Sequence, residues 1–164
     1  MGKTLVIYFS LEGNTEFAAK TIAETLKADV LKLELVKSIS STGFSRFFWG
    51  GKQVVMKEAP ELRQFSQNPA AYDLIILGTP VWAGSYAPAL RTFFKTTPLT
   101  GKRLALFCCY ANNAGKTFEA MKAALPGNAF LGEKGFLNPA KQPEQVKNDI
   151  IAWAKSIFET ATKK

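Results

Sequence analysis

The feature that most constrains the fold is a short run, Asp73 to Thr79 (DLIILGT), which is apolar almost from end to end. A strand exposed on one side alternates apolar and polar residues, so this run indicates a strand that is covered on both faces. Such coverage is typical of the centre of a parallel sheet with helices on both sides. The sequence therefore predicts an α/β protein.

Strand-like and helix-like segments alternate along the whole chain. This alternation predicts right-handed crossovers and a three-layer, doubly wound, five-stranded parallel sheet. We expect the other strands at 3–9, 29–35, 102–110 and, more weakly, 128–137, and the helices at 14–27, 87–97, 115–125 and 143–164.

The connection between the second and third strands, residues 36–72, is longer than an ordinary crossover. It contains an aromatic-rich stretch at 43–57 that favours a helix, followed by a polar stretch. A chain of 164 residues is long enough to bury one substantial core. We therefore interpret residues 1–164 as a single domain with an excursion at 36–72.

Residue types that are absent or few exclude several kinds of site. The chain has no histidine, which is the commonest general base and zinc ligand, and we predict no metal site. Its two cysteines, Cys108 and Cys109, are adjacent, and neighbouring cysteines bridge only through a strained ring. We therefore expect two small buried thiols at a strand end rather than a disulfide or a redox pair.

Lysine and arginine total 21 against 13 acidic residues, so the formal net charge is +8. This charge favours acidic partners, but the basic residues are scattered and form no run of five, which makes nucleic-acid binding a poor explanation for them. No apolar run approaches the roughly 20 residues of a membrane span. The first strand begins close to Met1, leaving no room for a signal peptide, so we expect a cytoplasmic protein.

In a doubly wound sheet, ligands bind beyond the carboxyl ends of the strands, where the strand order reverses. The loops to consider there are 10–15, 79–86 and 110–115.

The first of these loops, SLEGNT, precedes the first helix and is rich in uncharged donors. Ser10, Asn14 and Thr15 provide hydroxyl and amide groups, Gly13 permits a tight turn, and the N–H groups of the new helix point the same way. The loop contains no lysine or arginine, which suits a phosphate that is bound and kept rather than transferred. The alternative is an ordinary capped turn before a helix.

The second loop places Trp82 just past the end of the buried strand, beside Gly84. A large aromatic side chain in such a loop is typical of a surface that a flat ligand covers. The alternative is that Trp82 packs under the 36–72 excursion.

The third loop contains Gly115-Lys116-Thr117, which is how a phosphate-binding P-loop ends. The first glycine of that motif would fall at Tyr110, which does not suit the tight cradle. A magnesium-binding aspartate at a strand end is also missing, since the only acidic strand end is Glu34 on the second strand. We interpret Lys116 as a surface lysine and the P-loop similarity as accidental.

Together the three loops resemble those of the flavodoxin family. The matching stretches are YFSLEGNTEFAAK (8–20), GTPVWAGSYAPALRTF (78–93) and FCCYANNAGKTFEAM (107–121), in the family's order and spacing over the whole chain. A further stretch, WGGKQVVMKEAPEL (49–62), resembles a bacterial subgroup with an extended segment before strand three. The resemblance implies a flavodoxin-like fold with strand order 2-1-3-4-5, and FMN as the cofactor.

The resemblance also implies a cofactor site in three parts. Trp82 would stack on the isoalloxazine ring, and the peptide between Ala83 and Gly84 would flip to accept a hydrogen bond from the reduced ring. The implied residues are Ser10, Leu11, Glu12, Gly13, Asn14 and Thr15 for the phosphate, Thr79, Pro80, Val81, Trp82, Ala83 and Gly84 for the ring, and Tyr110, Ala111, Asn112 and Asn113 for the opposite wall.

The chain departs from the family's pattern in two respects. Familiar flavodoxins are strongly acidic, whereas this chain has a formal charge of +8, so we expect the last reduction step of the flavin to be less negative in potential. The third loop has Ala111-Asn112-Asn113 where relatives have a glycine-rich sequence.

The leading functional hypothesis is an electron carrier that cycles FMN between the oxidised, semiquinone and hydroquinone states and serves redox partner proteins, as a monomer or a weak dimer. The alternative is an FMN-dependent NAD(P)H quinone or nitro reductase on the same fold, which would need an open face over the flavin. A flavin-free interaction module is a third hypothesis. No residue stands out as an acid–base catalyst, and one-electron transfer requires none.

Overall fold

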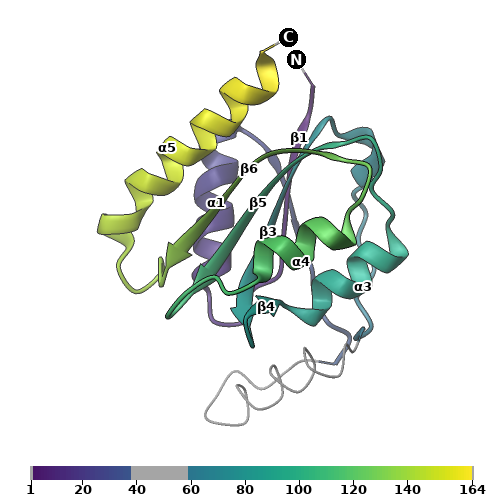
Figure 1. Cartoon of the computed structure of the whole chain (residues 1–164), viewed down its shortest axis with the longest axis horizontal. Coiled ribbons are helices and arrows are strands. Elements are labelled where there is room, and N and C mark those ends of the chain that lie inside the picture. Colours follow the sequence, from purple (N-terminus) through teal and green to yellow (C-terminus); the bar gives the residue numbers. More distant parts are fainter. Residues whose placement is uncertain (1, 38–58, 164) are drawn as a thin grey trace.

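The computed structural model describes residues 2–37 and 59–163, and its centre is a parallel sheet (Figure 1). The strand order is β2-β1-β3-β5-β6, which is the expected order once the two-residue strand β4 is set aside. The expected doubly wound, flavodoxin-like sheet is therefore confirmed. The strands are β1 (Thr4–Tyr8), β2 (Asp29–Lys32), β3 (Leu74–Trp82), β4 (Ser85–Tyr86), β5 (Arg103–Tyr110) and β6 (Ala129–Leu137).

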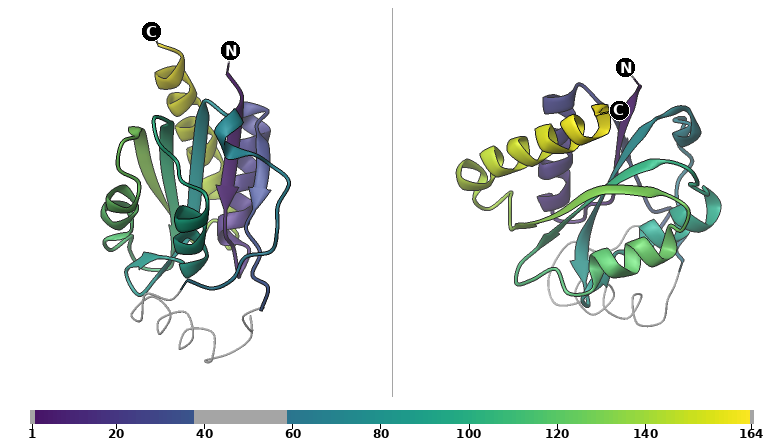
Figure 2. Two further views of the ribbon diagram at one scale, coloured as in Figure 1. Left: turned by 90° about the vertical axis from the view of Figure 1, so that its right-hand side faces the viewer. Right: turned by 45° about the horizontal axis from the view of Figure 1, so that its top comes forward.

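Helices cover both faces of this sheet and make the fold three layers thick (Figures 1 and 2). One face carries α1 and α5, which contact each other, and the other face carries α3 and α4. None of the helices in the described part of the chain is both long enough and apolar enough to cross a membrane. The helices are α1 (Asn14–Leu26), α3 (Pro88–Thr96), α4 (Thr117–Ala124) and α5 (Pro143–Thr162), with a short 3-10 helix η1 (Pro69–Ala71).

Strand alternation divides the core into two clusters, one under each helical layer. In β1, Leu5 and Ile7 face the layer of α3 and α4, whereas Val6 and Tyr8 face α1 and α5. Successive side chains of a strand point to opposite faces, so positions 5–8 of this strand are all hydrophobic because both faces are covered.

The central strand β3 fits its place because its neighbours leave no room for a side chain at Gly78. Residues 74–79 of β3 are buried. A Cβ atom at Gly78 would lie only 2.0 Å from the ring of Phe107 on β5. The glycine therefore lets the aromatic ring of the adjacent strand pack directly on the backbone.

Two strand ends differ from the sequence prediction. β3 continues to Trp82 because Val81 and Trp82 pair with β4 in an antiparallel hairpin. β2 ends at Lys32, and Leu35 forms only an isolated bridge to Leu62.

The described end of the excursion, residues 59–72, returns along the edge strand. The Val36 N–H donates to the Glu61 carbonyl (2.9 Å), and the Arg63 N–H donates to the Glu34 carbonyl (2.7 Å). The helical stretch expected at 43–57 lies outside the described residues, so its structure and its relation to the flavin stay predictions.

Candidate functional site

A cavity of about 270 Å³ opens at the carboxyl edge of the sheet, where the order reverses between β1 and β3. It brings together parts of all three loops that the sequence indicated, and a fourth loop that it did not. The lining residues are Ser10, Leu11, Glu12, Asn14, Thr15, Pro80, Val81, Trp82, Ala83, Cys109, Tyr110, Ala111 and Asn138.

One end of the cavity, which we call the helix end, is the turn from β1 into α1. Gly13 is the N-cap of α1 and has a left-handed φ of 99°, a conformation that glycine adopts without strain. The Gly13 N–H donates to Ser10 Oγ (3.2 Å), which closes the turn. Because a glycine cap has no side chain to accept from the first N–H groups of α1, those donors stay available to an anion.

Thr15 adds a further donor at the helix end. Its side chain is 1% exposed, and Oγ1 has no hydrogen-bond partner that meets normal geometry in the described part of the chain. The polar group that lies next to it is the thiol of Cys109, which is a weak hydrogen-bond partner. A buried hydroxyl without a good partner beside a cavity is typical of a ligand-binding position.

Asn14 lines the cavity and also has a structural role that its position did not indicate. Its Oδ1 accepts a hydrogen bond from the N–H of Ala140 (3.0 Å), in the loop between β6 and α5. This bond leaves the amide N–H groups of Asn14 for a ligand and fixes the fourth loop against α1.

Glu16, the acidic residue in the first turn of α1, forms ion pairs with two lysines. Glu16 pairs with Lys20 (3.0 Å) and Lys32 (3.4 Å) and accepts a hydrogen bond from the Tyr8 hydroxyl (3.2 Å). The hydrogen bond from Lys20 is the main cause that lowers the pKa of Glu16. Its negative charge is therefore partly compensated close to the anion-binding N-terminus.

The other end, which we call the hairpin end, is the β3–β4 hairpin. Trp82 pairs with Ser85 across a two-residue turn of Ala83 (φ 49°) and Gly84 (φ 71°). Two positive φ values define the tight turn that suits the twist of a hairpin. The ring of Phe9 meets Trp82 edge-on, with ring centres 5.6 Å apart, so one edge of the indole is fixed.

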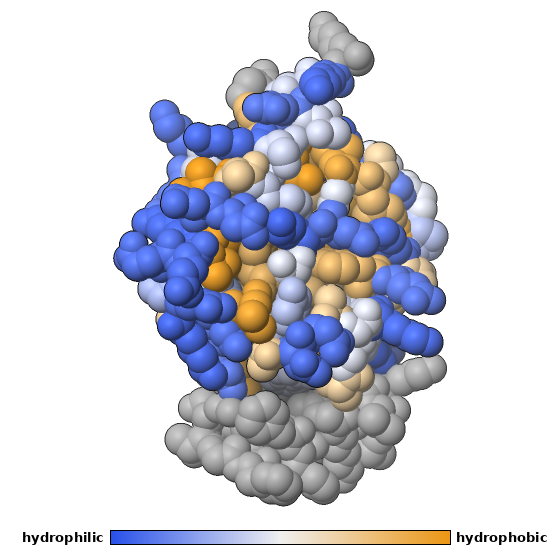
Figure 3. Space-filling model, turned by 60° about the vertical axis from the view of Figure 1, so that its left-hand side comes forward, coloured by the Kyte–Doolittle hydropathy of each residue, from blue (hydrophilic) through white to orange (hydrophobic). Residues whose placement is uncertain are grey.

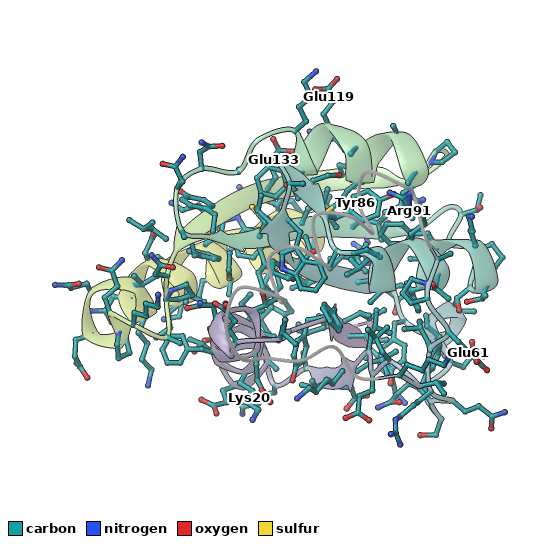
Figure 4. The ribbon with its side chains drawn as sticks, turned by 90° about the horizontal axis from the view of Figure 1, so that it is seen from below. Lys20, Glu61, Tyr86, Arg91, Glu119 and Glu133 are labelled. Atoms are coloured by element: carbon teal, nitrogen blue, oxygen red, sulfur yellow. The ribbon has the colours of Figure 1, made fainter. Side chains whose placement is uncertain are left out.

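Packing outside the cavity supports the hairpin from behind. Figure 4, which views the molecule from below, shows Tyr86 and Arg91 lying beside each other. The Arg91 guanidinium carbon lies 5.5 Å from the ring centre of Tyr86, within cation–π range.

Thr79 lies off the cavity wall although it belongs to the predicted ring-binding loop. Its side chain is fully buried, accepts a hydrogen bond from the Ala87 N–H (2.9 Å) and donates to the Pro80 carbonyl (2.8 Å). The hydroxyl therefore ties the two ends of the hairpin loop together.

The segment that resembles a P-loop packs against the hairpin instead of forming a cradle. Gly115 has a φ of 54°, and a Cβ atom there would lie 2.7 Å from the backbone of Gly84. The Lys116 N–H donates to the Gly84 carbonyl (2.8 Å), and the Gly115 N–H donates to Asn113 Oδ1 (2.9 Å). These donors are used inside the protein, in agreement with our interpretation of the motif as accidental.

Several residues that the resemblance implied are therefore not part of the cavity lining, and their contact with a cofactor stays a prediction. They shape the loops instead, as the turn at Gly13 and the contact at Gly84 illustrate. The residues are Gly13, Thr79, Gly84, Asn112 and Asn113.

Two lining residues, Cys109 and Asn138, were missed by the sequence reasoning. Cys109 faces the α1 and α5 layer at the end of β5, and Asn138 follows the edge strand β6. Strand alternation applied to Cys109 would have placed it beside the first loop, whereas Asn138 has no such signal.

The two adjacent thiols are buried and have no disulfide, as free cysteines on opposite sides of β5. Burial is the main cause that raises the pKa of both thiols, from an ordinary 9.0 to about 12 for Cys108. Both thiols are therefore protonated at neutral pH and unsuited to act as nucleophiles.

Comparison with known proteins agrees with this geometry. The model of the family described as NADPH-dependent FMN reductase matches residues 3–131. A putative flavoprotein from Bacteroides eggerthii is 22% identical, with a TM-score of 0.77, and the match covers 96% of this chain and 99% of that one. A flavoprotein from Lactobacillus acidophilus, solved in complex with FMN, is 20% identical, with a TM-score of 0.73 and coverage of 88% and 98%. Oxidised flavodoxin 2 from Bacillus cereus is 22% identical, with a TM-score of 0.61 and coverage of 96% and 98%.

Proposed function

Because the chain belongs to the NADPH-dependent FMN reductase family, we propose that it is an FMN-containing reductase that takes electrons from NADPH and passes them to a small acceptor such as a quinone or a nitro compound. The family match favours this alternative over the electron carrier that the flavodoxin resemblance led us to expect first. Service to redox partner proteins stays a prediction.

FMN is the cofactor, and the residues of the cavity fit it. The helix end offers the N-terminus of α1 and the buried hydroxyl of Thr15, which suit a phosphate held by uncharged donors. The hairpin end offers the indole of Trp82, which suits a flat aromatic ring. Bound FMN supplies the hydride and electron chemistry.

The chain's own groups position the cofactor and leave the chemistry to it. The titratable side chains in the cavity lining are Glu12, Cys109 and Tyr110. Of these, Cys109 is protonated at neutral pH because burial raises its pKa. A reductase of this kind needs no acid–base side chain for hydride uptake by the flavin, so this lining suits the proposed reaction.

The net charge of +8 also supports a dinucleotide substrate. NADPH is a polyanion, and a basic protein raises the encounter rate with a polyanion at low ionic strength. The observation that carries the proposal is the two-ended cavity in a chain of this family.

Steady-state oxidation of NADPH by the FMN-loaded protein, followed by its absorbance with a soluble quinone as acceptor, tests the proposal. We expect turnover that depends on both FMN and quinone, and a KM for NADPH that rises with salt. A protein that binds FMN tightly but oxidises NADPH with neither quinone, nitro compound nor free FMN as acceptor would contradict the reductase and favour the electron carrier.

A further inference from the structure

We propose that the side-chain amide of Asn138, the first residue of the β6–α5 loop (138–142), binds the ribityl chain of FMN. Asn138 has this role only if FMN occupies the cavity, so the assignment rests on the cofactor part of the proposed function. It does not depend on NADPH turnover.

The backbone of Asn138 is fixed on both sides. Its N–H donates to the Tyr110 carbonyl (2.9 Å), and its carbonyl accepts from the Lys141 N–H (2.9 Å). Its φ of 39° lies in the left-handed region, where asparagine is among the few tolerated residues other than glycine. The direction in which the side chain leaves the backbone is therefore set by the fold.

The side-chain amide of Asn138 has no protein hydrogen bond in the described part of the chain, although the residue is half-buried and lines the cavity. Two other asparagines use theirs: Asn14 accepts from Ala140, and Asn128 donates to the Leu99 carbonyl (2.9 Å). Among the described residues, Asn138 thus adds to the cavity lining a half-buried amide whose donor and acceptor capacity is unused.

Asn138 is bonded to the end of β5 and lies two residues from a contact with the helix end, and this position suits the ribityl chain. Its backbone is bonded to Tyr110, at the end of β5, while Ala140, two residues later, is bonded to Asn14 at the start of α1. In FMN the ribityl chain joins ring and phosphate, and its hydroxyl groups both donate and accept hydrogen bonds. A carboxamide is chemically matched to such groups.

Titration of the apoprotein with FMN, riboflavin and lumiflavin, which lacks the ribityl chain, tests this assignment. The variant Asn138→Gly removes the amide and tolerates the positive φ. We expect Kd to rise about tenfold for FMN and riboflavin alike and to stay unchanged for lumiflavin. A rise for FMN alone would assign Asn138 to the phosphate and overturn the proposal, as would equal rises for all three flavins or none.

Ala140→Gly is the matched control, because it loosens the same loop at an exposed residue and keeps the N–H that bonds to Asn14. We expect its three Kd values to match the wild type. Asn138→Asp keeps an acceptor and adds a charge, so an additional loss specific to FMN would place the residue beside the phosphate and contradict the ribityl assignment. Thermal unfolding of each apoprotein verifies that the variants fold.

Failure of this inference is distinguishable from failure of the proposed function. If the wild-type protein binds none of the flavins, the cofactor site itself is wrong. If binding is tight and Asn138→Gly weakens it as expected while NADPH is not oxidised, the assignment of Asn138 stands and the reductase activity does not.

Discussion

The helix end and the hairpin end of the cavity solve the problem of holding a ligand in opposite ways. The helix end keeps polar groups unused, with a glycine cap and a buried Thr15 hydroxyl without a good partner. The hairpin end uses its polar groups internally, since Thr79 bonds across the loop and the Gly84 carbonyl accepts from Lys116. One end therefore offers hydrogen bonds, and the other offers a rigid apolar surface.

Hydrogen-bond donors that are unused and donors that are used within the protein are both informative. An orphan donor indicates where a charged or polar part of a ligand would be compensated. A fully satisfied loop indicates where shape matters more than polarity, because a ring that stacks needs a surface that does not yield. The predictions below test each end separately.

The largest effect is expected from Gly115→Ala, which disrupts the contact between residue 115 and Gly84 at the hairpin end. The new Cβ would lie 2.7 Å from the Gly84 backbone, at a φ of 54° that alanine adopts with strain. We expect the free energy of unfolding to fall by roughly 3 kcal/mol. Gly101→Ala is the matched control, since Gly101 has a φ of 68° but nothing within 4 Å, and we expect it to lose only about 1 kcal/mol in denaturant titrations.

Trp82→Ala removes the flat surface of the hairpin end. We expect the Kd for FMN and that for riboflavin to rise together, by about 30-fold, since stacking on an aromatic side chain contributes about 2 kcal/mol. Flavin fluorescence quenching measures both, and Trp82→Phe restores most of the affinity. A loss confined to FMN would mean that Trp82 does not contact the ring.

Thr15→Val tests the helix end and should separate binding from stability. Because the hydroxyl lacks a good partner in the folded chain, its removal should leave the unfolding free energy unchanged or raise it by about 1 kcal/mol. FMN affinity should fall about tenfold while riboflavin affinity stays the same. If both flavins weaken equally, the helix end does not hold the phosphate.

The effect that is smallest at neutral pH concerns the thiol of Cys108 in β5, and it appears only above pH 9. Burial raises the pKa of Cys108 from 9.0 to about 12, so between these values the unfolded chain releases a proton that the folded chain keeps. Stability contributed by this thiol is complete below pH 9 and is lost as the pH rises towards 12, by up to about 1.4 kcal/mol per pH unit.

Cys108→Ala should flatten that part of the stability profile above pH 9 in parallel denaturant titrations. An identical decline in the variant would assign it to other groups, such as lysines.

The sequence predicted the fold well where burial leaves a pattern. The run at 73–79, which is apolar over 74–78, became the core of β3, since a strand covered on both faces has few polar positions. The hairpin strand β4 was missed because two residues are too few to show a period. The edge strand β6 was only weakly indicated because many of its side chains are partly exposed.

The candidate site was predictable wherever a loop had a distinctive composition. The hydroxyl residues of 10–15, Ser10 and Thr15, and the tryptophan at 82 line the cavity. Thr79 was predicted on the wall from its place in the loop, but its hydroxyl points to internal partners that no local pattern shows. Asn138 depends on contacts between distant segments, which a local pattern does not record.

Figure 3 shows apolar groups exposed between bands of hydrophilic side chains on one face of the molecule. The exposed large apolar residues among those described are Val36 and Leu137, at 44% and 43%. Leu137 ends β6 and immediately precedes Asn138, so an exposed apolar side chain adjoins the cavity lining in the sequence.

The hydrogen bond between Ala140 and Asn14 joins residues 126 positions apart along the chain. We expect a contact between such distant segments to form late in folding, because closing so long a loop costs conformational entropy. The helix end is thus complete only once the β6–α5 loop has docked against the start of α1. During refolding, the time at which flavin fluorescence is quenched would therefore report when the β6–α5 loop contacts α1.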